Sequence, residues 1–353
     1  MAAPAHIVVI RFSAMGDVAL LAPVLQSAAS QNPDIRLTLV TRPKFSALFS
    51  NLKSINIFSA DVDYVYNGLL GLWRLASVIR SMKPSAVVDV HDHLRTKILG
   101  LLLRLSGIKV IVFDKGRKEK QSLIRIKNKN RSGPLLHTCE RYRLALVKAG
   151  LTISQVIDSP IKGISEEKNL PPFLVSIKNK RLVGIAPFAA HFTKMWPLEK
   201  FRQVIKSFAV EKEIIFLLFG GGEIEKQKLK SIASEFSNCV NVSGQLSLPE
   251  ELSLMSRLEV MVCVDSSNMH LASLSGIPVL SVWGGTHTDT GFGPVPDSRN
   301  RIIEIPVEDM ACRPCSVYGL SKCPRNDHAC MQQISPESVT TTLREMLNLK
   351  PEN

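Results

Sequence analysis

The sequence has few aromatic residues and no long apolar run. Phe, Trp and Tyr make up 6% of its 353 residues, and Arg104 interrupts the apolar candidate around residues 101–105. A transmembrane helix needs about 20 consecutive apolar residues, so we expect no membrane-spanning helix. Residues 1–6 contain neither a basic segment nor a long apolar one. We therefore expect no signal peptide and a cytoplasmic location.

Acidic residues are also in short supply. Asp and Glu total 31 against 44 Lys and Arg, which gives a net charge of +13. Such a surplus favours an anionic partner: nucleic acid, a phosphorylated substrate or an anionic membrane. The densest basic stretch, residues 115–131, is either a solvated loop or a flap over an anionic acceptor. It contains no aromatic side chain on which bases would stack, so we expect no nucleic acid among the partners.

The spacing of apolar residues predicts an α/β protein. In the first half, short apolar runs alternate with segments of helical periodicity, an order that favours a parallel sheet covered by helices. The expected strands are residues 6–10, 36–41, 85–90 and 109–113, and the expected helices are 18–29, 69–82, 94–105 and 140–149. The motif G-x-G-x-x-G is absent, which excludes the usual dinucleotide fingerprint.

The alternation restarts after a weakly periodic connection at residues 152–180. The expected strands are then 182–186, 214–219, 239–242, 258–264 and 279–282, and the expected helices include 198–208, 224–236, 249–257 and 336–347. We predict two Rossmann-like doubly wound domains, residues 1–160 and 161–334, facing across a cleft. The last segment, residues 335–353, would return as a helix to the N-terminal domain.

A polar cluster at residues 265–268 occupies a strand-to-helix turn. A buried strand precedes it, and an apolar helical face begins at Met269. Unpaired backbone N–H groups and the positive end of the helix dipole bind anions at such a turn, most often phosphate. His270 lies one turn inside and can add a hydrogen bond. The alternative is a plain helix cap with a surface histidine.

Three other residues have the chemistry of a phosphate or sugar site. Asp17 follows the first strand and Gly16, and it is either a helix cap or a general base. Lys194 stands between the second domain's first strand and the next helix, where it can neutralise a diphosphate. Glu225 follows the glycine-rich turn at residues 220–222 and can bind ribose hydroxyls, although such a turn is weak evidence alone.

Together these segments resemble glycosyltransferase family 9, the heptosyltransferases that build the inner core of lipopolysaccharide. Residues 10–18 match the family's R-x-S-x-x-G-D pattern. In the second half the resemblance rests on residues 194–197, 221–225, 241–245, 248–252, 264–272, 278–279 and 283–286. It implies a GT-B fold and a metal-independent, inverting transfer from a nucleotide-activated sugar, which is ADP-heptose in the best-known members.

Carried over residue by residue, the resemblance makes Asp17 the general base and places Lys194 on the donor diphosphate. The other substrate-binding residues that it implies are Ser13, Gly16, Glu225, Asp265, Ser266, Ser267, Asn268 and His270. Two departures bear on the donor. Ala189 and Ala190 replace the family's frequent Thr or Ser, and Ser267 replaces its usual Gly.

The resemblance also implies partners. The donor would bind the C-terminal domain, and the acceptor would be an acidic, phosphorylated glycolipid at the cytoplasmic face of the inner membrane, which fits a basic N-terminal domain. The enzyme would be peripheral to that membrane and require no cofactor. The alternatives are a different hexosyltransferase or a nucleotide-sugar epimerase on the same plan and, from another class, a nucleic-acid-binding protein.

Three further patterns concern metals. A short late segment has the spacing C-x₂-C-x₇-C-x₆-C, formed by Cys312, Cys315, Cys323 and Cys330. These cysteines are either a structural zinc site or reduced thiols. Asp61-Val62-Asp63 matches the metal signature of another glycosyltransferase class, but it lies in the wrong domain. Residues 89–93 end a strand, and they are a hydrogen-bonded terminus, part of the acceptor pocket or metal ligands.

Overall fold

The computed structural model describes residues 5–125, 133–156, 174, 177 and 179–349. By contacts, the chain divides into two compact units. The first contains residues 1–117 and 136–159, and the second contains residues 118–135 and 160–353. Each unit is built on its own parallel sheet. None of the described helices is long and apolar enough to cross a membrane.

The first unit has a five-stranded parallel sheet with the order β3-β2-β1-β4-β5. Its strands are β1 (His6–Ile10), β2 (Arg36–Thr41), β3 (Ile55–Ser59), β4 (Ala86–Asp89) and β5 (Val110–Val112). Its helices are α1 (Met15–Ala19), α2 (Leu21–Gln31), α3 (Gly68–Ser81), α4 (Leu94–Leu105) and α6 (Thr138–Lys148), with a 3₁₀ helix η1 (Pro43–Phe49). The order of strands reverses between β1 and β4, where ligands of doubly wound sheets bind.

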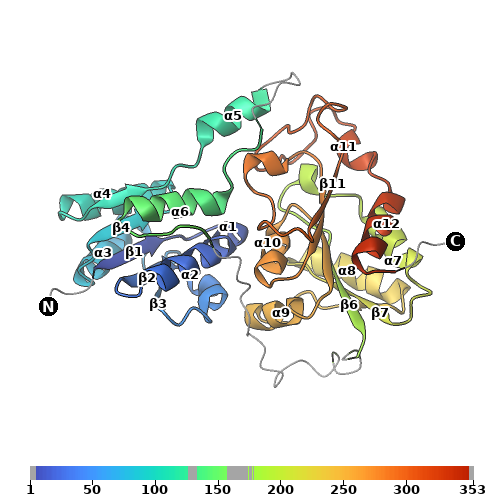
Figure 1. The fold of residues 1–353 in the computed structure, drawn as a ribbon, viewed down its shortest axis with the longest axis horizontal. Coiled ribbons are helices and arrows are strands. Elements are labelled where there is room, and N and C mark those ends of the chain that lie inside the picture. Colours follow the sequence, from blue (N-terminus) through green and yellow to red (C-terminus); the bar gives the residue numbers. More distant parts are fainter. Residues whose placement is uncertain (1–4, 126–132, 157–173, 175–176, 178, 350–353) are drawn as a thin grey trace. The chain divides into compact units, whose positions relative to one another are not determined.

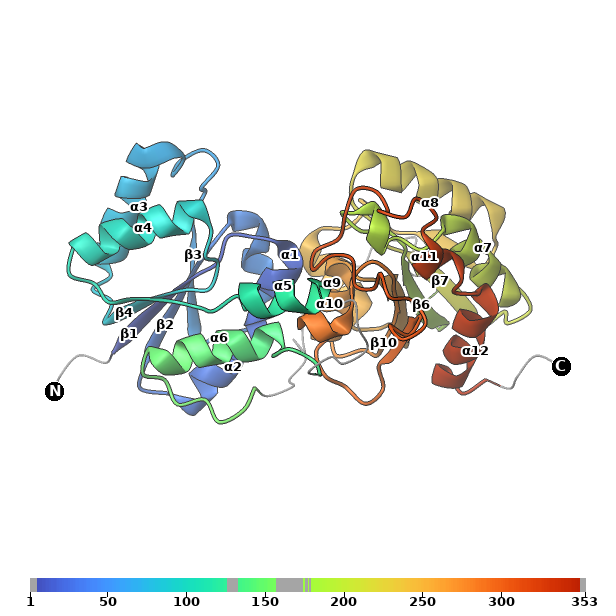
Figure 2. The ribbon, with the colours of Figure 1, turned by 90° about the horizontal axis from the view of Figure 1, so that it is seen from above.

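Apolar residues of this sheet and its covering helices form the first core. Val8, Ile10 and Val87 from the strands pack with Leu75 of α3 and Leu99 of α4. Helices α3 and α4 contact each other on one face of the sheet, and α2 and α6 contact each other on the other (Figure 2). This is the arrangement that right-handed βαβ crossovers produce.

The second unit has a six-stranded parallel sheet with the order β11-β10-β9-β6-β7-β8. Its strands are β6 (Arg181–Ala186), β7 (Ile214–Leu218), β8 (Cys239–Asn241), β9 (Val260–Val264), β10 (Val279–Trp283) and β11 (Arg301–Glu304). Its helices are α7 (Leu198–Ser207), α8 (Glu223–Glu235), α9 (Leu248–Met255), α10 (Ser267–Leu274), α11 (Ala329–Gln332) and α12 (Pro336–Met346), with η4 (Phe192–Lys194) and η5 (Thr288–Thr290). Figure 1 shows α7 and α8 on one side of this sheet and α9 and α10 on the other. The order reverses between β6 and β9.

The last helix does not return to the first unit, and that expectation was wrong. Helix α12 packs on α7 within the second unit (Figure 1). Val339, Leu343 and Leu347 are buried in the second unit's core. An amphipathic helix packs with its apolar side against other apolar residues. For α12 these residues belong to α7, β9 and β11.

The basic stretch forms a helix over part of its length. Residues Arg117–Arg125 are α5, and the contacts group residues 118–135 with the second unit. Lys120 is buried there, with Nζ 4.0 Å from the ring centroid of Phe292. Lys127, Lys129 and Arg131 lie outside the described residues, as does most of the expected connection at residues 152–180.

Candidate functional site

A buried ion pair of the second unit lies where the strand order of its sheet reverses. Lys194 ends η4 after β6, and Asp265 follows β9, the neighbouring strand. Lys194 Nζ lies 2.9 Å from Asp265 Oδ2, and the two side chains are only 15% and 6% exposed. The fold therefore holds an ion pair at the edge where parallel sheets of this type bind ligands.

The loop after β10 completes the surroundings of Asp265. Thr286 Oγ1 donates a hydrogen bond of 2.7 Å to Asp265 Oδ2. The N–H of Gly285 donates to the carbonyl of Thr193, 2.9 Å away. A Cβ atom on Gly285 would lie 2.7 Å from Cβ of Thr193, so glycine is required for this approach. The segment that carries Lys194 is thus fixed against the loop that carries Thr286.

Helix α10 begins beside this ion pair. Ser266 is its N-cap residue in an extended conformation, and no side chain caps the helix. The Oγ atom of Ser266 is buried and has no hydrogen-bond partner among the described residues. Ser267 and Asn268 form the half-buried first turn, and His270 is buried just behind them. Uncapped backbone N–H groups, a hydroxyl without a partner and a neighbouring lysine have the chemistry of an anion-binding site.

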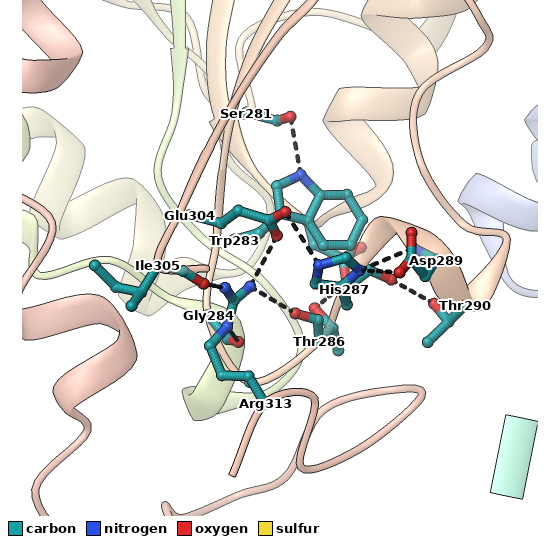
Figure 3. Close-up of polar contacts among 12 residues, drawn as sticks. Ser281, Trp283, Gly284, Thr286, His287, Asp289, Thr290, Glu304, Ile305 and Arg313 are labelled. Carbon is teal, nitrogen blue, oxygen red and sulfur yellow. Dashed lines mark hydrogen bonds and ion pairs between the residues drawn. The ribbon is translucent and has the colours of Figure 1, made fainter. Parts of the chain in front are cut away.

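A buried network supports the loop of Thr286 (Figure 3). Arg313, 1% exposed, donates to the carbonyl oxygens of Gly284 at 2.6 Å and Thr286 at 3.2 Å, and also to that of Ile305. Its Nη2 also lies 2.9 Å from Glu304 Oε2. One guanidinium therefore ties the ends of β10 and β11 together and fixes the backbone on which Thr286 sits.

His287 extends this network (Figure 3). Its Nε2 lies 3.1 Å from Glu304 Oε1, and its Nδ1 lies 3.3 Å from Asp289 Oδ2. Burial favours the neutral ring, but the hydrogen bonds and negative charges of Asp289 and Glu304 outweigh it and raise the pKa of His287 to about 9. When the ring is neutral, Nδ1 accepts a hydrogen bond from the Asp289 N–H, 3.1 Å away.

Glu225 lies in the first turn of α8, on the same unit. Its Oε2 accepts a hydrogen bond of 2.7 Å from the N–H of Gly221. The carboxylate therefore orders the glycine-rich turn after β7. The contact of Glu225 with ribose stays a prediction.

Asp17 lies at the reversal point of the first unit, in α1 directly after β1. Arg11 Nη2 lies 2.6 Å from Asp17 Oδ2, and the Ala14 N–H donates to the same oxygen at 3.4 Å. Asp17 is thus a first-turn cap as well as an ion-pair partner. Arg11 is buried, also donates to the Val90 carbonyl, and orients the carboxylate. Among the described residues Oδ1 makes no hydrogen bond, and it is the oxygen free to take a proton.

Ser13 and His91 meet at the same edge. Ser13 Oγ lies 3.0 Å from His91 Nε2, and His91 follows β4, the strand beside β1. Burial, followed by the positive charges of Arg11 and Lys115, lowers the pKa of His91 to about 3. The ring is therefore neutral and acts as a hydrogen-bond donor or acceptor. Gly16 is buried inside α1 and has no side chain to contribute.

Basic side chains surround this edge of the first sheet. Asp92 Oδ2 lies 2.6 Å from Arg117 Nη2, and Asp92 Oδ1 lies 3.6 Å from Lys97 Nζ. Lys115 Nζ donates to the Asp92 carbonyl at 2.9 Å. Residues 89–93 are therefore a hydrogen-bonded strand terminus, and the surplus of cations at this edge suits an anionic ligand.

The two metal patterns have other contacts. Asp61 Oδ1 accepts hydrogen bonds from the N–H groups of Asp63 and Tyr64, and Asp63 Oδ1 lies 2.8 Å from Arg42 Nη2. All four late cysteines are free thiols. Within the described ranges, no three His, Cys, Asp or Glu side chains form a group that could hold a metal ion. Structural zinc at the cysteines stays a prediction, tested by metal analysis of the purified protein.

Several residues of these sites were not predicted to act in them. Arg11 lies within the recognised N-terminal motif, and Thr286 within the recognised segment 283–286, but neither was given a role. His287, Glu304 and Arg313 lie outside the recognised segments. A buried arginine bonded to loop carbonyls has no sequence signature, because its partners come from distant strand ends.

Comparison with known proteins gives consistent matches. The model of glycosyltransferase family 9 (heptosyltransferase) matches residues 72–318. The lipopolysaccharide core heptosyltransferase OpsX of Haemophilus influenzae is 22% identical over 296 residues, covering 80% of this chain and 79% of that protein. A family 9 glycosyl transferase from Veillonella parvula has a TM-score of 0.76 at 20% identity, with 99% and 98% of the two chains covered. E. coli heptosyltransferase WaaC with ADP-2-deoxy-2-fluoro heptose has a TM-score of 0.64 at 18% identity, with 96% and 99% covered.

Proposed function

The chain belongs to glycosyltransferase family 9, and its fold is GT-B as predicted. From this premise we propose that it transfers a heptose from ADP-heptose to the inner core of lipopolysaccharide or to a related lipid-linked acceptor. The observation that carries the proposal is the buried contact of Lys194 with Asp265 beside the uncapped start of α10. The match to WaaC with an ADP-sugar analogue supports ADP-heptose as the donor.

The second unit holds the donor in this proposal. The first N–H groups of α10 and the Ser266 hydroxyl bind the diphosphate, and Lys194 neutralises the charge that develops on it. Asp265 keeps Lys194 in position until the donor arrives. Glu225 binds the ribose, and Ser267, Asn268 and His270 shape the phosphate pocket.

The first unit holds the acceptor. Asp17 Oδ1 takes the proton from the acceptor hydroxyl, and the oxygen attacks the anomeric carbon on the side opposite the diphosphate. The bond between that carbon and the diphosphate oxygen breaks, and ADP leaves with the electron pair. Ser13 and His91 orient the acceptor, and the transfer inverts the anomeric configuration. No metal takes part in this step.

The acceptor is an acidic, phosphorylated glycolipid at the cytoplasmic face of the inner membrane. The cations around Asp92 at the acceptor edge and the net charge of +13 support this choice. Arg117 and Lys97 would exchange part of their contact with Asp92 for contacts with the acceptor phosphate.

A panel of nucleotide sugars tests the donor. A ligand that binds only the native state raises the melting temperature, and we expect ADP-heptose to raise it more than UDP- or GDP-sugars do. Transfer to a core acceptor should proceed unchanged in EDTA. If a UDP-sugar raised the melting temperature and ADP-heptose did not, the donor would be a UDP-sugar. Loss of transfer in EDTA would show that the reaction needs a metal ion.

A further inference from the structure

Helices α3 and α4 of the first unit, with the turn before α3, expose many large apolar side chains. Eight of the seventeen large apolar side chains exposed in the described residues fall within residues 64–105. They are Tyr64, Val65, Leu69, Leu70, Trp73, Leu94, Leu101 and Leu105. Their exposures run from 55% to 85%. We call this surface the α3–α4 face.

The exposed residues of α4 form one stripe. Leu94, Leu101 and Leu105 are spaced by seven and four residues, which places them on one side of the helix. The opposite side is already used, because Leu99 and Leu103 are buried against the sheet. Apolar residues on the solvent side of such a helix are not needed for the core, and they indicate a surface that binds something.

Helix α3 shows the same pattern beside it. Leu69, Leu70 and Trp73 are exposed, while Leu72 and Leu75 are buried. The two helices contact each other on one face of the sheet (Figure 2), so their outer sides form a continuous surface. Both helices begin at the carboxyl edge of the strands, the edge at which Asp17 lies. The first turns of α3 and α4 therefore lie at the edge where we propose that the acceptor binds.

The charge of this surface favours an anionic partner. The two helices carry five basic residues and no acidic ones: Arg74, Arg80, Arg95, Lys97 and Arg104. Leucine and tryptophan among arginines and lysines suit the interface of an anionic bilayer, where the rings and leucines enter the headgroup region and the cations meet lipid phosphates. A second copy bound through the same face would bring like charges together.

We propose that the α3–α4 face binds an anionic phospholipid surface. The inference deepens the proposed function and rests on it for the acceptor, because a membrane-embedded glycolipid would then reach the Asp17 edge without leaving the bilayer. Binding to lipid itself requires neither donor nor acceptor.

Trp73 provides a direct probe. The other two tryptophans, Trp196 and Trp283, are 2% and 0% exposed, whereas Trp73 is 60% exposed. With vesicles of phosphatidylglycerol and phosphatidylcholine at 3:1, the full chain should co-sediment, and its emission should shift to shorter wavelength. Lipids brominated on the acyl chain should quench that emission. Trp73→Phe should abolish both the wavelength shift and the quenching. Added salt should weaken binding, because it screens the cations.

Matched variants distinguish binding through this face from nonspecific adsorption to vesicles. Leu70→Glu and Leu101→Glu should lower vesicle partitioning by about tenfold or more, because each removes an apolar contact and adds a repelled charge. Ile224→Glu and Val210→Glu, at 71% and 77% exposed on the second unit, should leave it unchanged. All four positions are exposed, and unchanged melting temperatures would show that the variants fold.

The outcomes are distinct. Absence of binding to the anionic vesicles, or equal loss with Ile224→Glu, would overturn the proposal. A wild-type dimer that Leu70→Glu makes monomeric without changing vesicle binding would assign the face to a second copy. If the protein transferred heptose to a soluble acceptor but did not bind vesicles, only the lipid-binding proposal would be rejected. If it bound vesicles but transferred no heptose, only the proposed function would be rejected.

Discussion

Lys194 Nζ lies 2.9 Å from Asp265 Oδ2 at the point where the second sheet reverses its strand order. The lysine is therefore positioned before any ligand arrives, and its carboxylate partner is fixed in turn by Thr286. A preorganised cation of this kind stabilises negative charge that develops on a leaving group without first having to be oriented.

Lys194→Ala should weaken ADP binding by about 10- to 100-fold. The change removes a charge-assisted contact, typically worth about 1.5–3 kcal/mol, and leaves Asp265 without its counterion. Calorimetric titration with ADP measures the effect. Lys226→Ala is the control, because Lys226 pairs with an exposed glutamate, Glu223, on the same unit. Equal ADP affinity in wild type and Lys194→Ala would show that the diphosphate does not bind at Lys194.

Thr286→Val should lower both the stability and the donor affinity. Valine has the shape of threonine but cannot donate to Asp265 Oδ2, which would keep only Lys194, and the loss of a hydrogen bond to a charged group costs about 1.5–3 kcal/mol. Urea denaturation of the two proteins measures the difference. Thr286→Ser keeps the hydroxyl and should therefore lose less stability and less donor affinity than Thr286→Val. If valine and serine variants behave alike, the hydroxyl is not what holds Asp265.

His287 should make the stability depend on pH above neutrality. Its folded-state pKa of about 9 lies above the ordinary value of 6.5, so its stabilisation is fully present below about pH 6.5 and is lost as pH rises through 9. The stability difference between wild type and His287→Gln should therefore shrink by on the order of 2 kcal/mol from pH 7 to pH 10. Denaturation at both pH values measures it, and a constant difference would show that the ring is neutral throughout.

His91 should stay neutral across the physiological range. Burial and the positive charges of Arg11 and Lys115 hold its pKa at about 3, so protonation would be reached only in acid, where it destabilises the fold. The ring carbon resonances of His91, assigned by comparison with His91→Gln, should not titrate between pH 5 and 8. A midpoint near 6.5 would contradict the neutral contact with Ser13.

The sequence predicts the inner strands well, because they are buried on both sides. After the first residues of β1 and β6, which are His6 and Arg181, the strands β1, β6 and β9 are continuous apolar runs, and the structure confirms strands there. The edge strands β3 and β11 were missed. They mix polar with apolar residues, and most of their residues are exposed or half-buried, so they lack that signal.

The site residues were predicted in part. The motif at residues 265–268 indicated a phosphate-binding helix start, and the chain does begin α10 there without a side-chain cap. The pairing of Asp265 with Lys194 could not be predicted from the sequence, because 71 positions separate the two residues. Only the adjacency of β6 and β9 brings them together. The Arg313 and His287 contacts likewise depend on β10 lying beside β11.

The turnover and donor affinity of Asp17→Asn show whether Asp17 is the general base. Asparagine is nearly isosteric but cannot take the acceptor proton, so ADP-heptose should bind as in wild type by calorimetry while transfer falls by about 100-fold or more. A transfer rate close to that of the wild type would contradict the assignment of Asp17 as the base and, with it, the proposed mechanism.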